Sequence, residues 1–433
     1  MDTPTRRRVH VTTLGCRLNQ YDSEMLLTQL RSEGYVETPS AREADLVVVN
    51  TCAVTETAER KGRAAIRAAL RQNPQTEVVA TGCHAERAPE ALLKSGASRI
   101  LGNREKEQFL EFLNLDESIQ IGGIHTATGW TDGTRIAGLG GRVRTFLKVQ
   151  DGCSQHCTYC IVPQLRGAGR SLPIFDALER ARVLIDCGVQ EIVVTGVALG
   201  TYGFDWNERD ALPQLLEALA ELPGLRRLRL SSVEPWAVSE RFLKTMAAHE
   251  NICPHLHLPF QSGSDAVLRR MNRRYTVRQL RQIVETARGL RDDWGIGADV
   301  ITGFPGETPE NFAQTRNLLT ELEISYLHVF PFSARPGTAA TRLPDGVTQT
   351  ESARRADKLR ELSRALRGRF HDRQVGREGE VIAERRGAGK YLYGHARNYA
   401  DVAIPRDRVE AGQVIHFRVE RADADFLYAQ PIV

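Results

Sequence analysis

Three cysteines lie within eight residues directly after a buried strand, and this feature constrains the fold of the chain more than any other. The apolar run Phe146–Val149 predicts the strand, and Cys153, Cys157 and Cys160 follow it. Thiolates at this spacing can hold three irons of a four-iron cluster. A zinc site is the alternative, but structural zinc needs four ligands, and His156 sits awkwardly between two of the cysteines. We therefore predict an iron–sulfur cluster in this loop.

A cluster held by three cysteines leaves one iron open to a cofactor. An open iron can bind the amino and carboxylate groups of S-adenosylmethionine and pass one electron to it. Homolytic cleavage then gives a carbon radical that is strong enough to break an unactivated C–H bond. The loop therefore predicts radical chemistry, with its three cysteines as the catalytic residues.

Three further cysteines, far apart in the sequence, each follow a predicted strand. The strands are expected at Val9–Leu14, Leu46–Asn50 and Val78–Thr81, with helices at Ser23–Glu33 and Ala58–Gln72 between them. This order predicts a parallel sheet, whose strand ends meet at one edge. A second cluster would form there on three thiolates; the alternative is three buried structural cysteines. The residues concerned are Cys16, Cys52 and Cys83.

The rest of the composition excludes some classes of protein. No apolar run reaches the roughly 18–20 residues of a membrane helix, and no apolar segment of a signal peptide follows the first arginines. We therefore expect a cytoplasmic protein without a membrane contact.

The net charge of +4 gives only weak support for a nucleic-acid partner. Cys187 and Cys253 fit neither cysteine set and are interpreted as structural.

The strand and helix patterns predict an α/β protein of three parts. Residues 1–120 are expected to form a Rossmann-like cluster-binding domain, and residues 121–141, rich in Gly and Thr, a linker. Residues 142–370 carry six strand–helix units, which predict a partial TIM-like (βα)6 barrel with chemistry at the C-terminal ends of its strands. Residues 371–433 carry five short alternating strands, which predict a small β-barrel.

The motifs around both cysteine sets resemble the methylthiotransferase family of radical S-adenosylmethionine enzymes over the whole chain. The final segment resembles the RNA-binding TRAM barrel. The resemblance implies two [4Fe-4S] clusters: the one on Cys153, Cys157 and Cys160 cleaves S-adenosylmethionine, and the other carries the sulfur that is transferred. The segments that carry the resemblance are Thr13–Glu24, Val49–Thr55, Ala80–Cys83, Asp151–Pro163, His255–Ser264 and Asp299–Glu307.

The family divides by substrate, and the segment Leu-Gly-Cys-Arg-Leu-Asn-Gln-Tyr, residues 14–21, is most similar to the branch that modifies threonylcarbamoyladenosine. The branch that acts on isopentenyladenosine usually has Phe-Gly-Cys-Gln-Met-Asn there, and the branch that acts on a ribosomal aspartate has Pro-Lys-Asn after the cysteine. The basic helix after Cys52 also resembles the first branch, through Arg60, Lys61, Arg63 and Arg67. The resemblance thus implies transfer to C2 of threonylcarbamoyladenosine-37 in tRNA.

Five residues near the predicted strand ends are candidates for contact with S-adenosylmethionine. A core or turn role is the alternative for Tyr159 and Gly196. One departure from the family is Ala198, where Asn or His is expected, so any contact from that side chain is missing. The candidates are Tyr159, Gly196, Ser232, Gln261 and Asp299.

The implied partners are tRNA, through its anticodon stem-loop, and an electron donor such as flavodoxin or ferredoxin, with the protein itself a monomer. The arginine-rich run 269–275, which ends in Tyr275, has a composition that suits contact with a flexible RNA loop; a solvated helix face is the alternative.

Two other functions remain open from the sequence. One is the same chemistry on isopentenyladenosine-37 or a ribosomal aspartate, and the other is a non-catalytic iron–sulfur protein that binds RNA.

Overall fold

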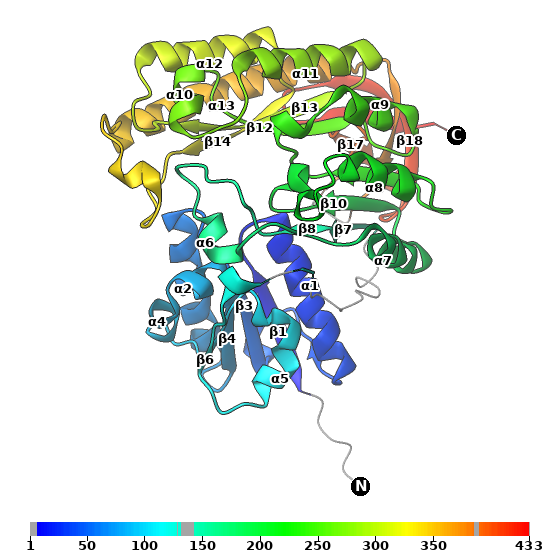
Figure 1. Ribbon diagram of the computed structural model, residues 1–433. Helices are drawn as coiled ribbons and strands as arrows, with labels where there is room; N and C mark the ends of the chain where they lie inside the picture. Colours follow the sequence, from blue (N-terminus) through cyan, green and yellow to red (C-terminus); the bar gives the residue numbers. More distant parts are fainter. Residues whose placement is uncertain (1–6, 128, 131–142, 385–388, 433) are drawn as a thin grey trace.

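A computed structural model describes residues 7–127, 129–130, 143–384 and 389–432 (Figure 1). An N-terminal parallel sheet lies beneath a central barrel, and a curled C-terminal sheet packs against that barrel on one side. The α/β architecture expected from the sequence is therefore confirmed. Of the expected linker, residues 128 and 131–141 lie outside the described residues. No described helix combines the length and the apolar character needed to span a bilayer.

The N-terminal sheet has six parallel strands in the order β2-β1-β3-β4-β5-β6, with helices on both faces. Every residue of the central strand β3 is buried, as a strand covered on both sides requires. The three expected strands are confirmed; the short β2, β5 and β6 were not expected. The bounds are β1 Arg8–Thr13, α1 Arg17–Ser32, β2 Val36–Glu37, β3 Leu46–Thr51, α2 Glu56–Gln72, β4 Glu77–Gly82, α3 Cys83–Arg87, α4 Pro89–Leu93, β5 Arg99–Leu101, α5 Phe109–Leu113 and β6 Ile119–Gln120.

The central barrel is open and consists of two three-stranded parallel sheets, β11-β10-β7 and β12-β13-β14. Isolated parallel bridges from Leu228 to Ile252 and from Ser232 to His257 join the two sheets into one curved wall. All six expected strands are present. The bounds are β7 Arg144–Lys148, α7 Ile174–Asp186, β10 Glu191–Thr195, α8 Ala211–Ala220, β11 Arg227–Leu230, α9 Glu240–Ala248, β12 His255–Gln261, α10 Asp265–Arg270, α11 Val277–Leu290, β13 Gly295–Thr302, α12 Pro309–Glu321 and β14 Tyr326–Pro331.

Side chains on the barrel strands alternate between two environments. Leu256, Leu258, Ala298, Val300 and Leu327 face outward into the large apolar core beneath the helices. The opposite face of the same strands carries polar side chains toward the barrel interior. The barrel therefore has an apolar outer layer and a polar interior, which suits a reaction chamber.

A long helix, α13 (Gln349–Asp372), leads from the barrel to the curled C-terminal sheet. Its five strands have the order β15-β18-β19-β17-β16, and bridges from Val381 to Ala396 and from Glu384 to Tyr393 link its two edges. All five expected strands are confirmed. The bounds are β15 Glu378–Ile382, β16 Tyr391–His395, β17 Asp401–Pro405, β18 Val414–Ala422 and β19 Leu427–Pro431.

Candidate iron–sulfur and cofactor site

The three N-terminal cysteines meet at the carboxyl edge of the first sheet. Cys16 precedes α1, Cys52 directly follows β3, and Cys83 begins α3. Gly15 lets the first loop cross the second, because a Cβ at Gly15 would lie 3.0 Å from the Sγ of Cys52. The three thiols are close enough to act on one another electrostatically: the other two raise the pKa of Cys52.

Buried amide side chains hold these loops in register. The Nδ2 of Asn19 donates to the carbonyl oxygens of Leu14 (2.7 Å) and Thr51 (2.9 Å), so it ties the end of β1 to the end of β3. Asn50 Nδ2 donates back to the carbonyl of Asn19 at 2.9 Å. The Thr51 hydroxyl donates to the carbonyl of Thr81, which connects β3 to β4. These hydrogen bonds therefore connect the ends of β1, β3 and β4 that carry the three cysteines.

The second set of cysteines lies in the loop between β8 (Gln150–Asp151) and α6 (Val162–Arg166). Backbone contacts shape this loop: the N–H of Cys160 donates to the carbonyl of Cys157 at 3.0 Å, and the N–H of Gln155 donates to Cys153 Sγ at 3.4 Å. Arg273 reaches in from the barrel, and its Nη1 donates to Cys157 Sγ at 3.1 Å. The structure thus brings these three thiols together beside a buried cation.

The surroundings of both sets of thiols suit metal binding better than the presence of free thiolates. Burial raises the pKa of Cys16, and it raises the pKa of Cys52 and of Cys160 to about 12 and that of Cys153 to about 11. Cys16 is exposed to solvent, whereas Cys52 and Cys83 are buried. A bound cation would reverse these shifts, because ligating thiols are deprotonated.

The number of thiols favours a cluster over a structural zinc ion, since each set offers three cysteines and structural zinc needs four ligands. Among the described residues, another group of possible metal ligands lies outside both cysteine sets. It consists of His257, Asp299 and His328, whose ligand atoms lie within 4.8 Å of one another, and Asp299 is hydrogen-bonded to both histidines.

The two cysteine sets face each other across a thin apolar layer. Ala53 and Ile161, each next to a cysteine of a different set, pack with Cys83 and Leu165 in one buried cluster. Asn103 connects the same parts, because its Nδ2 donates to the carbonyl of Leu165 at 2.8 Å and lies 3.9 Å from Cys83 Sγ. The structure therefore joins the two sites into one junction.

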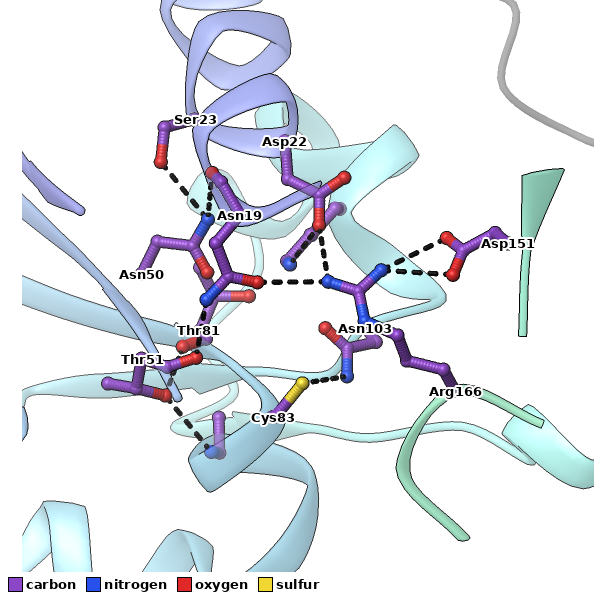
Figure 2. A network of polar contacts seen from close by, with 12 residues as sticks. Asn19, Asp22, Ser23, Asn50, Thr51, Thr81, Cys83, Asn103, Asp151 and Arg166 are labelled. Atoms are coloured by element: carbon purple, nitrogen blue, oxygen red, sulfur yellow. Dashed lines mark hydrogen bonds and ion pairs between the residues drawn. The ribbon is translucent and has the colours of Figure 1, made fainter. Parts of the chain in front are cut away.

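Arg166 crosses this junction and is fully surrounded by its partners (Figure 2). Its Nη1 donates to both carboxylate oxygens of Asp151, and its Nη2 donates to Asn19 and Asp22 at 2.9 Å. Although burial alone would lower the pKa of Arg166, the two carboxylates and the Cys83 and Cys16 thiols raise it well above its usual value. A permanent positive charge therefore stands beside the first set of thiols.

Three buried polar atoms at successive strand ends have no hydrogen-bond partner among the described residues. They are Oγ1 of Thr195, the last residue of β10, Oγ of Ser231, directly after β11, and Oε1 of Gln261, the last residue of β12. Gln261 also has a left-handed backbone, with φ of 59°. Strain and unmet hydrogen bonds at one edge are typical of a ligand site. The sequence does not single out Thr195 or Ser231, because their only signal is a position at the end of a strand.

The other cofactor candidates have mixed surroundings. Tyr159 is half-buried and packs edge-on against Phe304, with ring centroids 6.4 Å apart. Gly196 faces Gln150, whose Cβ would lie 2.9 Å from an added Cβ. Ser232 bridges to His257 at the sheet junction. Asp299 lies in the middle of β13 rather than near its end, and it accepts hydrogen bonds from two histidines.

Part of the arginine-rich run does not form an exposed RNA surface. Tyr275 is buried and donates to the carbonyls of Pro259 and Phe260, so its ring is not available to stack on an RNA base. Arg273 points at Cys157. Arg269, Arg274 and Arg278 are exposed.

The two cysteines outside both sets differ in burial. Cys253 is buried, as a structural role requires, but Cys187 is exposed at the end of α7.

Comparisons with known proteins agree with this geometry. The family model described as Uncharacterized protein family UPF0004 matches residues 8–102, and the Radical SAM superfamily model matches residues 147–319. Among solved structures, the radical S-adenosylmethionine methyltransferase TsrM from Kitasatospora setae has a TM-score of 0.56 at 15% identity, over 78% of this chain and 77% of its own. That likeness shows a shared fold.

Curated relatives are much more similar in sequence. Threonylcarbamoyladenosine tRNA methylthiotransferase MtaB of Thermotoga maritima is 36% identical over 381 residues, which cover 87% of each protein. The protein of the same name from Bacillus subtilis is 32% identical over 95% of this chain and 93% of its own. This chain therefore belongs to the radical S-adenosylmethionine methylthiotransferases, in the MtaB branch.

Proposed function

We propose that this enzyme transfers a methylthio group to C2 of N6-threonylcarbamoyladenosine at position 37 of tRNA, using two [4Fe-4S] clusters and S-adenosylmethionine. The observation that carries the proposal is the junction of two three-cysteine sets through Ala53, Cys83, Ile161 and Leu165. One such site accounts for a radical enzyme. A second site next to it accounts for delivery of sulfur to the carbon that the radical has activated.

The residues at both sites fit iron–sulfur clusters. Each set offers three thiols, one fewer than the four ligands of a structural zinc site, and burial raises the pKa of Cys52 in one set and of Cys160 in the other. Cys153, Cys157 and Cys160 would hold one cluster, and Cys16, Cys52 and Cys83 the other. When bound, the clusters supply the electron that cleaves S-adenosylmethionine and the sulfur that is transferred.

The remaining residues of the site bind and orient. Arg273 and Arg166 place fixed positive charges beside the two sets of thiols, which favours the anionic form of each. Thr195, Ser231 and Gln261 offer free hydrogen-bonding atoms to S-adenosylmethionine at the carboxyl edge of the barrel. We retain Tyr159, Gly196, Ser232 and Asp299 as further candidate contacts. Asp299 is placed better for the substrate, because it faces the interior.

The proposal includes the partners and the division of labour along the chain. Residues 1–120 carry the sulfur-donor site, residues 142–370 the radical site, and residues 371–433 an RNA-binding barrel, with a linker at residues 121–141. The anticodon stem-loop of tRNA is the RNA bound, because an unpaired base leaves its stack more easily than a paired one. A flavodoxin or ferredoxin would supply electrons to the monomeric enzyme in the cytoplasm.

The first test supplies anaerobically reconstituted protein with tRNA bearing threonylcarbamoyladenosine, S-adenosylmethionine and a reductant. Mass spectrometry of the digested nucleosides should show a methylthio group gained on that nucleoside. Formation of 5′-deoxyadenosine without a modified nucleoside would mean a different substrate, and isopentenyladenosine tRNA is then the next to be tried. Failure of both reactions with verified clusters would contradict the proposal.

The roles of the two sites are separated by Cys16→Ala. We expect this variant to lose methylthiolation while it still forms 5′-deoxyadenosine, because Cys16 belongs to the sulfur-donor set alone. Cys157→Ala should lose both products and serves as the comparison. Full methylthiolation by Cys16→Ala would refute the assignment of the donor site.

A further inference from the structure

The chamber, defined here by His255, His257, Asp299, Tyr326 and His328, is a polar wall on the inner face of β12, β13 and β14. A chain of hydrogen bonds runs along it. The Tyr326 hydroxyl lies 2.8 Å from His255 Nε2 and 3.0 Å from His257 Nδ1, while Asp299 Oδ1 lies 2.8 Å from His257 Nε2 and 3.2 Å from His328 Nδ1. His328, at the end of this chain, is exposed to solvent.

Arg17 enters the chamber from the N-terminal sheet. It is the first residue of α1, directly after Cys16, and its Nη2 donates to the hydroxyl of Tyr399 in the C-terminal sheet at 3.1 Å. Its positive charge reaches the chamber wall, because it helps to lower the pKa of His255 and His257, after the larger effect of burial. Arg17 therefore lies where all three parts of the chain meet.

Arg17 is a cation without a carboxylate partner among the described residues. The other charges of the chamber are paired: Arg229 binds Glu191 at 2.7 Å, and Asp299 accepts from two histidines. The half-buried guanidinium of Arg17 has five N–H donors, of which the Tyr399 contact uses one. A buried or half-buried arginine with free donors is suited to bind a carboxylate through two parallel hydrogen bonds.

The proposed substrate carries a free carboxylate, which is the partner that Arg17 does not have within the described part of the protein. In threonylcarbamoyladenosine, a urea links N6 to the amino group of threonine, and the threonine carboxylate and hydroxyl stay free. N6 and C2 are on the same six-membered ring. Consecutive Cα atoms are about 3.8 Å apart, so a base whose C2 faces the Cys16 site brings its N6 substituent close to Arg17.

We propose that Arg17 binds the carboxylate of the threonylcarbamoyl group and is a specificity-determining residue of the enzyme. The inference rests on the proposed function, since it names the threonine carboxylate as the part of that substrate which the enzyme recognises. Asp299 and His328 then face the threonine hydroxyl and the urea N–H groups. An isopentenyl group carries no charge and leaves Arg17 unpaired, so the same contact discriminates against that substrate.

The test compares two synthetic anticodon stem-loops with the reconstituted holoenzyme. One carries threonylcarbamoyladenosine, and the other carries its neutral analogue with a primary amide in place of the threonine carboxylate. The dissociation constant and kcat/KM are measured for the wild type, Arg17→Gln and Arg17→Lys. The matched control is Arg182→Gln, which makes the same chemical change on the outer face of α7, where Arg182 is half exposed and pairs with Glu179.

The wild type and Arg182→Gln should prefer the acid over the amide by roughly 10- to 150-fold, the range for hydrogen bonds to a charged group. In Arg17→Gln this preference should fall to within about threefold, because the constants for the acid worsen far more than those for the amide, whose carbonyl oxygen accepts only a neutral-group hydrogen bond from Arg17. Arg17→Lys keeps the positive charge but not the two parallel N–H donors of the guanidinium, so it should retain part of the preference. Iron content and 5′-deoxyadenosine formation verify that each variant is folded and loaded.

Two results would overturn the inference. Equal weakening of both stem-loops by Arg17→Gln would mean that Arg17 only fastens the N-terminal sheet to Tyr399. A wild type that methylthiolates acid and amide equally well would mean that the carboxylate is not read, although the proposed function stands. If the wild type modifies neither stem-loop while its clusters are intact, the proposed function itself fails.

Discussion

At the scale of single residues, the junction depends most on Asp22, a buried carboxylate in contact with three cations. Lys106 Nζ lies 2.8 Å from its Oδ2, and Lys148 Nζ lies 3.0 Å from its Oδ1. Arg166 also binds it, as Figure 2 shows. Burial alone would raise the pKa of Asp22, but these cations hold it well below its usual range. Its charge therefore stabilises the fold above the unfolded pKa of about 3.9, and this stabilisation is lost as the pH falls toward the folded pKa.

Asp22→Asn should lower the free energy of unfolding by about 3–5 kcal/mol at pH 7, because it removes the buried carboxylate that Lys106, Lys148 and Arg166 share and leaves Asp151 as the carboxylate that faces Lys148 and Arg166. Chemical denaturation measures this loss, and repeating it at acidic pH should show a shallower pH dependence in the variant. Asp357→Asn, whose exposed carboxylate pairs with Arg360 on α13, should stay within about 0.5 kcal/mol. A loss at Asp22 no larger than this control would contradict the argument.

At the scale of elements, the turns after the strands position the cysteines, and the turn before Cys83 is one of the tight ones. Gly82 has a φ of 94° at the start of α3. A Cβ there would lie 2.3 Å from the carbonyl oxygen of Thr51 and 2.5 Å from Asn50 Oδ1. Only glycine allows β4 to pass this close to β3 and then turn into the helix that begins with the cysteine.

Gly82→Ala should therefore displace Cys83 and reduce the iron bound after anaerobic reconstitution by about the content of one cluster. The left-handed backbone adds about 1–2 kcal/mol of strain, and the clash adds about 1–3 kcal/mol. Gly34→Ala is the matched control, because Gly34 has a φ of 81° but nothing within 4 Å of an added Cβ. That variant should show the strain alone and keep its iron; iron loss in both, or in neither, would refute the role of the turn.

The sequence patterns predicted best those elements whose apolar residues recur with a clear periodicity. The expected strands Leu46–Asn50 and Val78–Thr81 lie within β3 and β4 and differ from them by one residue at one end of β3 and at each end of β4. By contrast, α1 begins at Arg17 rather than at the expected Ser23. Its first turn is polar because it faces the junction instead of the apolar core, and apolar periodicity cannot indicate such a turn.

The same reasoning explains which site residues were predictable. The two cysteine sets follow from local spacing and from the common edge of a parallel sheet. Arg17, Arg166 and Arg273 do not, since each acts on a partner 382, 147 or 116 residues away. Their roles come from tertiary contacts, and an arginine in a basic sequence gives no local sign of them.

At the scale of the whole molecule, the C-terminal sheet closes the end of the barrel where the strands begin. Arg229 donates to the carbonyls of Ala396 (3.0 Å) and Arg397 (2.8 Å), and the Tyr399 ring stacks on His255 with centroids 4.4 Å apart. The loop at residues 396–399 is thus the floor of the chamber. The C-terminal sheet, for which we propose RNA binding, therefore also shapes the chamber. RNA binding and substrate positioning are then coupled, since any shift of this loop also moves Tyr399, the partner of Arg17.

Gly295→Ala tests this coupling from the barrel side. A Cβ at Gly295 would lie 1.8 Å from the carbonyl oxygen of Asn398, so the loop must move away. We expect a loss of about 1–3 kcal/mol in the free energy of unfolding, faster amide hydrogen exchange at residues 396–400, and a smaller preference for the acid over the amide stem-loop. Gly289→Ala in α11 meets no atom within 4 Å, and it should gain up to about 1 kcal/mol without a change in preference. If Gly295→Ala loosened the loop but left the preference intact, the floor would be a structural plug that does not position Arg17.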